Sequence, residues 1–264
     1  AASQLFSEKN IGCSIEKSFD RYADVVKLAH EENLRIRGYV SCVLGCPYEG
    51  IVSSKRVADT SMKLHDMGCY EISLGDTIGI GNPGQATAVI RRVKEHIPVE
   101  MLAAHFHDTY GQALVNLLAV LQEGVAVIDS AVAGLGGCPF ARGATGNVAT
   151  EDVLYMLEGL GVDTGVDLHR VATAGHFISE KLGRNTNSRV AYNIARKTGE
   201  IKVPMAYRDM VAATLLDGVL SVEEIHMLRQ YRLRHNISVS EHISALEDLG
   251  WTEADFQKHG AGLR

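Results

Sequence analysis

Apolar and polar positions alternate with two different periods along the first 161 residues. Short apolar, β-branched runs that are typical of buried strands are followed by longer stretches with apolar residues at helical spacing. Four strands, each followed by a helix, predict βα units and a parallel sheet. The predicted strands are 35–43, 69–77, 99–108 and 125–134, and the predicted helices are 18–34, 53–68, 82–98, 111–124 and 149–161.

The rest of the chain, residues 162–264, has no strand pattern. Residues 162–199 look like further helix, most clearly over 167–183, and the pattern changes near 197–204. Ser221 with Glu224 and Ser238 with Glu241 fit capping boxes at helix starts. We therefore expect an α/β domain over 1–199 and a small all-α module of open role over 205–264, with helices at 207–216, 221–236, 238–250 and 252–260.

Polar residues gather where the predicted strands end. In parallel α/β proteins the carboxyl ends of the strands carry the functional site, both in a closed (β/α)₈ barrel and in an open doubly wound sheet. The pattern by itself does not choose between these folds, because a closed barrel needs eight strands and the sequence offers four. The strand-end residues are Asp76, Thr77, His105, His107, Asp108 and the loop after Gly134.

The spacing of two histidines points to a metal site. His105 and His107 lie two apart on a predicted strand, so their side chains share a face. Two adjacent imidazoles can bind one divalent cation, and Asp108 is placed to orient a ligand. The alternative is that one histidine is an ordinary hydrogen-bonded residue and the other faces solvent.

A glycine-rich loop over 134–147 follows the last predicted strand. Its five glycines allow the backbone to approach a ligand closely. Cys138 lies in the middle of this loop, where an accessible thiol is more typical of chemistry than of packing. A plain connection is the alternative. Asn147 ends the loop, as a neutral oxygen ligand, as a helix cap, or as both.

Three acidic residues have a structural interpretation beside a functional one. Asp76, at the end of a strand, is a candidate contact to substrate or metal-bound water, and a helix cap is the alternative. Glu151 and Asp152 fit the first turn of a helix, where the helix dipole favours acids. For these two residues the structural interpretation is the default.

Composition narrows the class of protein. With 264 residues, 46% of them hydrophobic, the chain can bury a sizeable core. A net charge of -6 argues against a nucleic-acid partner, and no apolar run is long enough for a membrane partner. The five cysteines are odd in number and scattered, so we expect free thiols in a reducing compartment.

Four segments of the chain carry a family resemblance, and they are 37–50, 68–84, 105–116 and 132–161. Together they resemble the hydroxymethylglutaryl-CoA (HMG-CoA) lyase family of metal-dependent TIM barrels, and the similarity extends over roughly residues 1–196. The resemblance implies cleavage of 3-hydroxy-3-methylglutaryl-CoA to acetyl-CoA and acetoacetate with Mg²⁺ or Mn²⁺. It also implies that His105, His107 and Asn147 are metal ligands, that His105 and Cys138 are catalytic, and that Asp76 belongs to the substrate site.

The chain also departs from the family pattern. The family's first strand ends in a G-P-R-D-G motif that supplies a further aspartate ligand and an arginine, and this sequence lacks it. We therefore expect about the last four βα units of the barrel, as a fragment of a longer protein, plus the helical module. An acyl-CoA substrate, a homodimer when complete, and a mitochondrial location in a eukaryote or a cytoplasmic one in a bacterium follow from the resemblance. A related acyl-CoA/2-oxo acid condensing synthase and a non-catalytic half-barrel scaffold are the alternatives.

Overall fold

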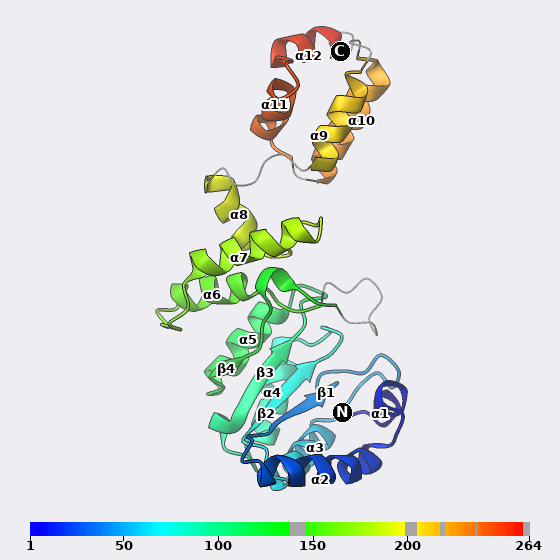
Figure 1. Ribbon diagram of the computed structural model, residues 1–264. Helices are drawn as coiled ribbons and strands as arrows, with labels where there is room; N and C mark the ends of the chain where they lie inside the picture. The colour runs from blue at the N-terminus through cyan, green and yellow to red at the C-terminus, as the bar shows by residue number, and fades with distance from the viewer. Residues whose placement is uncertain (138–145, 199–204, 217–219, 236, 261–264) are drawn as a thin grey trace. The chain divides into compact units, whose positions relative to one another are not determined.

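The computed structural model describes residues 1–137, 146–198, 205–216, 220–235 and 237–260 (Figure 1). The chain divides into two compact units, Ala1–Ile194 and Ala195–Arg264. The boundary lies within helix α8 (Arg189–Thr198). Each unit has its own hydrophobic core, so each is described by itself.

Among the described residues, one sheet of four parallel strands forms the centre of unit 1. The strands pair in sequence order, β1 (Arg37–Ser41), β2 (Glu71–Asp76), β3 (Leu102–Phe106) and β4 (Val127–Ile128). Helices α3 (Ser54–Asp66), α4 (Pro83–Val93), α5 (Ala113–Gln122) and α6 (Thr150–Gly159) follow the strands in turn. Parallel neighbours joined by one helix each are successive βα units of a barrel wall, so the predicted four units are confirmed.

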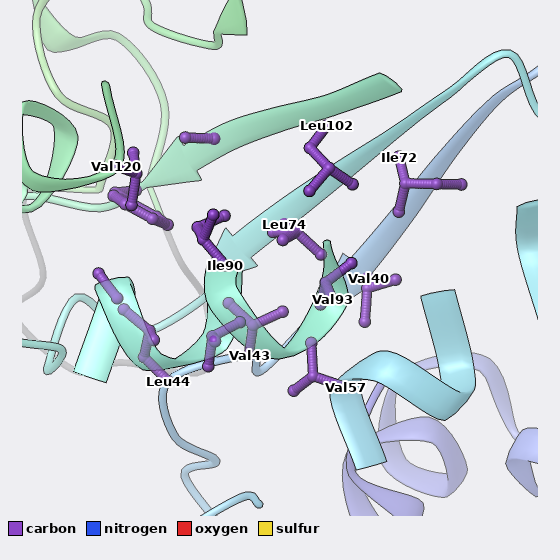
Figure 2. Packing of buried hydrophobic residues seen from close by; sticks show 14 of the residues in the cluster. Val40, Val43, Leu44, Val57, Ile72, Leu74, Ile90, Val93, Leu102 and Val120 are labelled. Carbon is purple, nitrogen blue, oxygen red and sulfur yellow. The ribbon is translucent and has the colours of Figure 1, made fainter. Parts of the chain in front are cut away.

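The core of unit 1 lies between the sheet and its helices. Figure 2 shows Leu74 of β2 close to Ile90 and Val93 of α4, and all three side chains are buried. Burying a side chain of this size contributes about 1.5–3 kcal/mol. Alternate strand residues face the other way, and there Tyr39 is exposed and His105 is partly exposed. The sheet therefore has an apolar helix-covered face and a polar face.

The main difference from the predicted elements lies at the fourth strand. β4 pairs over two residues only, although the apolar run continues to Gly134. A short 3₁₀ helix follows at Val132–Gly134, and within it Ala133 adopts a left-handed conformation, with φ at 55°. Helices α1 (Gln4–Ile11) and α2 (Ile15–Glu31) precede β1. The short α1 was not predicted, because its apolar residues show almost no helical periodicity.

In the described part of unit 2, four helices surround a separate core. They are α9 (Met205–Thr214), α10 (Val222–Arg234), α11 (Val239–Glu247) and α12 (Glu253–Gly260), while α7 (Leu168–Lys181) belongs to unit 1. The capping boxes at Ser221 and Ser238 are confirmed. A similar reciprocal pair joins Thr252 and Asp255. Helices α10, α11 and α12 therefore each begin at a residue that is reciprocally hydrogen-bonded to the first turn.

Within the part of the chain that the structure describes, none of the helices combines the length and the apolar composition needed to cross a bilayer.

Candidate active site

The carboxyl end of β3 carries the two histidines. The ring centroids of His105 and His107 lie 5.3 Å apart. Nδ1 is buried in both rings and has no hydrogen-bond partner among the described residues. Burial and the neighbouring His105 lower the pKa of His107, and a hydrogen bond to the Thr77 backbone opposes this. His107 is therefore neutral at neutral pH, as a metal ligand must be.

Asn147 is brought to the same place from the far end of the glycine-rich loop. Its backbone forms an isolated bridge with His107, and its Nδ2 donates to the Leu135 carbonyl over 2.8 Å. That hydrogen bond orients the amide and leaves Oδ1 to face a ligand. A Cβ on Gly136 would lie 2.7 Å from Nδ2 of Asn147, so glycine is needed there. The three predicted ligand residues thus lie together at one strand edge.

This donor set fits a divalent cation in geometry. Two imidazoles bound to one cation through N–metal bonds of about 2.1 Å have their centroids about 5 Å apart, close to the observed separation. Among the described residues, no group of three or more His, Cys, Asp or Glu side chains is arranged to hold a metal. The described donors are therefore two imidazoles and one amide oxygen, a set without negative charge.

Asp76 lies at the same edge, but its side chain is fully buried. Its Oδ2 accepts the backbone N–H of Gly81 over 2.9 Å. Burial raises the pKa of this carboxyl, and hydrogen bonds from the backbone of Gly79, Ile80 and Gly81 oppose the rise. Helix α4 is capped by Asn82, not by Asp76. Asp76 therefore holds the loop after β2 through Oδ2, while its Oδ1 is buried without a hydrogen-bond partner among the described residues.

Three residues that the sequence analysis did not single out complete the polar face. Asp129, directly after β4, accepts hydrogen bonds from Arg37 over 2.9 Å and from Ser73 over 2.7 Å. Its Oδ2 also lies 3.5 Å from Nδ1 of His105. Asp108, expected beside the histidines, accepts from the N–H of Ala113 at the start of α5. The sequence did contain a signal for Asp129, because an acidic residue inside the apolar run 125–134 is a candidate for a functional role.

Glu151 supports the stem of the glycine-rich loop. It lies in the first turn of α6, as predicted, but the helix dipole is not its main partner. Its side chain is fully buried, and both carboxylate oxygens accept from the N–H of Ala133, over 2.9 and 3.0 Å. Burial raises its pKa. The Ala133 carbonyl accepts from the N–H of Asn187 over 3.2 Å, so this strained residue is held on both sides.

Asp152, also in the first turn of α6, holds a second element. It accepts from Ser188 Oγ over 2.7 Å and from the N–H of Val190 over 2.9 Å, at the start of α8. A cavity of about 280 Å³ lies between Asp152, Asp108, Asn147 and Arg189. Cys138 falls within 138–145, outside the described residues.

This chain is similar to one family of known proteins over most of its length. The family model described as HMGL-like matches residues 1–178. Human mitochondrial hydroxymethylglutaryl-CoA lyase is 58% identical over 191 residues, which are 72% of this chain and 59% of that protein. The cytoplasmic 3-hydroxy-3-methylglutaryl-CoA lyase of Rattus norvegicus is 57% identical over 72% of this chain and 56% of that protein. The chain thus spans less than two thirds of these relatives.

Solved structures agree with the sequence relatives. The hydroxymethylglutaryl-CoA lyase of Pseudomonas aeruginosa matches with a TM-score of 0.73 and 55% identity, over 74% of this chain and 65% of that one. The HMG-CoA lyase of Acinetobacter baumannii, in complex with coenzyme A and 3-methylmalate, matches with a TM-score of 0.69 and 35% identity, over 72% and 62%. With its four βα units and this similarity, the chain belongs to the HMGL-like family.

Proposed function

We propose that this chain supplies the metal-binding part of a divalent-metal-dependent lyase that cleaves 3-hydroxy-3-methylglutaryl-CoA to acetyl-CoA and acetoacetate. The observation that carries the proposal is the convergence of His105, His107 and Asn147 at one strand edge, in a chain 58% identical to a curated lyase. That identity favours the lyase over a condensing synthase or a scaffold.

His105, His107 and Asn147 are the residues that hold the cation in this proposal. Mg²⁺ or Mn²⁺ bound there supplies Lewis acidity that lowers the pKa of the substrate's tertiary hydroxyl. His105 has an additional role in proton transfer, and Asp76, at the end of β2, belongs to the substrate site. Cys138 is the acid for the leaving thioester enolate, because a thiol with a pKa of about 8.5 can protonate a carbon base.

The partner and the compartment follow from the relatives. One relative binds coenzyme A and 3-methylmalate, which supports an acyl-CoA substrate here. Curated relatives are named mitochondrial, and one is named cytoplasmic. We assign a mitochondrial location if the source is eukaryotic and a cytoplasmic one if it is bacterial, and a homodimer for the complete enzyme.

Metal binding by residues 1–264 tests the proposal directly. We expect weak binding of Mn²⁺, because hard cations prefer anionic oxygen and the described donors are neutral. His105→Ala and His107→Ala should each weaken it at least tenfold, measured by electron paramagnetic resonance of free Mn²⁺. His96→Ala changes an exposed histidine elsewhere and is the matched control. Equal binding in all four proteins would place the metal elsewhere.

Turnover is then measured with 3-hydroxy-3-methylglutaryl-CoA as substrate and acetoacetate as the product assayed. Residues 1–264 are assayed alone and fused behind a relative's segment that carries the G-P-R-D-G motif. Activity is expected in the fusion only, and its loss in the His107→Ala fusion ties the activity to this edge. A fusion that binds Mn²⁺ but forms no acetoacetate would contradict the assigned reaction.

Cys138→Ser in the same fusion separates chemistry from packing. We expect an unchanged melting temperature and a kcat at least 100-fold lower, because a serine hydroxyl is a far weaker acid than a thiol. Cys69→Ser, at a buried cysteine near the sheet, is the comparison and should lower stability instead. A Cys138→Ser protein with a lowered melting temperature and normal kcat would show a structural cysteine.

A further inference from the structure

We propose that Asp129 is a positioning residue for His105. Its carboxylate accepts the Nδ1–H of the imidazole and thereby keeps Nε2 unprotonated toward the candidate site. The benefit to metal binding rests on the proposed function. The tautomer of His105 does not, because it is a property of the chain without metal.

The backbone places Asp129 beside His105. The N–H of Asp129 donates to the Ala104 carbonyl over 2.8 Å, which extends the pairing of β4 with β3 by one residue. Its carboxylate therefore starts from a fixed point on the neighbouring strand. Oδ2 lies 3.5 Å from Nδ1 of His105, and that buried Nδ1 has no hydrogen-bond partner among the described residues, so Asp129 is the acceptor within reach of it. The side chain of Asp129 is 21% exposed, so water competes little for this contact.

The charge of Asp129 is held by its other partners. Arg37 contacts both carboxylate oxygens over 2.9 Å, and Ser73 Oγ donates to Oδ2 over 2.7 Å. The two contacts with the Arg37 guanidinium pair this carboxylate with a positive charge, and the Ser73 hydroxyl donates a further hydrogen bond to it. An ionised carboxylate only accepts hydrogen bonds, so the facing Nδ1 must be the donor.

The tautomer matters for a metal ligand. A neutral imidazole has one N–H and one lone pair, and an acceptor at Nδ1 places the lone pair on Nε2. Carboxylates in this position also raise the basicity of the ligating nitrogen, and removing them typically weakens metal binding 10–100-fold. Asp129 thus keeps the lone pair of His105 on Nε2 even when no cation is bound.

A simpler alternative is that Asp129 only neutralises Arg37. The structure provides a matched control for it, because the carboxylate of Glu71 also pairs with Arg37 and does not contact His105. If charge balance at Arg37 were the whole role, Asp129→Asn and Glu71→Gln would have the same effect. If Asp129 sets the tautomer, only Asp129→Asn changes His105.

Nitrogen-15 NMR of the histidine rings tests the inference on residues 1–264 without metal. At pH 8.5, about two units above the ordinary histidine pKa, neutral imidazoles report their tautomer by the two nitrogen shifts. We expect His105 as Nδ1–H in the unchanged chain and in Glu71→Gln. In Asp129→Asn, Arg37 claims the amide oxygen and the amide N–H faces Nδ1, so His105 should change to Nε2–H.

Mn²⁺ affinity provides the second measurement. Asp129→Asn should weaken binding 10–100-fold and Glu71→Gln by less than threefold. An unchanged chain with His105 as Nε2–H would overturn the inference without any variant, and so would an identical tautomer in Asp129→Asn. If the unchanged chain has the expected tautomer but binds no Mn²⁺, the positioning role stands and the proposed metal site fails.

Discussion

Gly175→Ala is expected to lower the free energy of unfolding by about 2 kcal/mol, although alanine usually stabilises a helix interior relative to glycine. Gly175 lies within α7, and a Cβ there would stand 2.3 Å from Oε1 of Glu151. Glu151 cannot withdraw, because it is fully buried and both of its carboxylate oxygens bind the N–H of Ala133. The added methyl group therefore forces two packed helices apart or breaks this anchor.

A double-mutant cycle isolates the cause. Glu151→Ala removes the atom that the methyl group would strike, so Gly175→Ala in that background should be neutral or stabilising. Gly159→Ala in α6 is the matched control, since a Cβ there meets nothing within 4 Å. Urea unfolding followed by circular dichroism gives the four free energies. Equal destabilisation by Gly175→Ala in both backgrounds would show that Glu151 is not the obstacle.

Unit 2 is expected to lose about 2 kcal/mol of stability between pH 7.5 and pH 5, through one histidine. His242 is 1% exposed, its Nδ1 lies 2.7 Å from the Tyr207 hydroxyl, and its Nε2 has no hydrogen-bond partner among the described residues. Burial and the charge of Arg232 lower the pKa of His242 to about 4, against an opposing effect of Glu253. Burial likewise raises the pKa of Tyr207.

The sign follows from proton uptake. A histidine with a depressed folded-state pKa binds more protons when unfolded, so its stabilisation is complete above the unfolded value of about 6.5. It is lost as the pH falls from there through the folded value of about 4. The loss is therefore largest across mildly acidic pH.

Fluorescence of Trp251 reports the effect, because it is the chain's single tryptophan and it packs against the core of unit 2. Urea unfolding is measured at pH 7.5 and pH 5. His242→Phe should remove most of the pH dependence, because phenylalanine does not titrate. An apolar side chain should fit there, since the buried Ile225 and Phe256 occupy the corresponding place in the two other capped helices. His226→Gln, at an exposed histidine, should retain it. The same pH dependence in His242→Phe would exclude His242 as its source.

Local sequence was sufficient for the order of elements and for the edge that carries the chemistry. Apolar runs and helical spacing are properties of neighbouring residues, so β1 to β3 and α3 to α6 were predicted within a few residues of their ends. The spacing of His105 and His107 placed both on one strand end in the same way. The capping boxes of α10 and α11 were equally readable, because each joins residues three apart.

Only the tertiary structure showed which hydrogen-bond partners come together from distant parts of the chain. Asp129 meets Arg37 across 92 positions, and Glu151 meets Ala133 because α6 folds back against the turn after β4. Asp129 is partly buried and Glu151 is fully buried, although both acidic side chains could have faced water, and the free energy of that burial depends on donors from other elements. Sequence periodicity determines which face of an element is apolar, but only the packed fold determines which buried charge finds which donor.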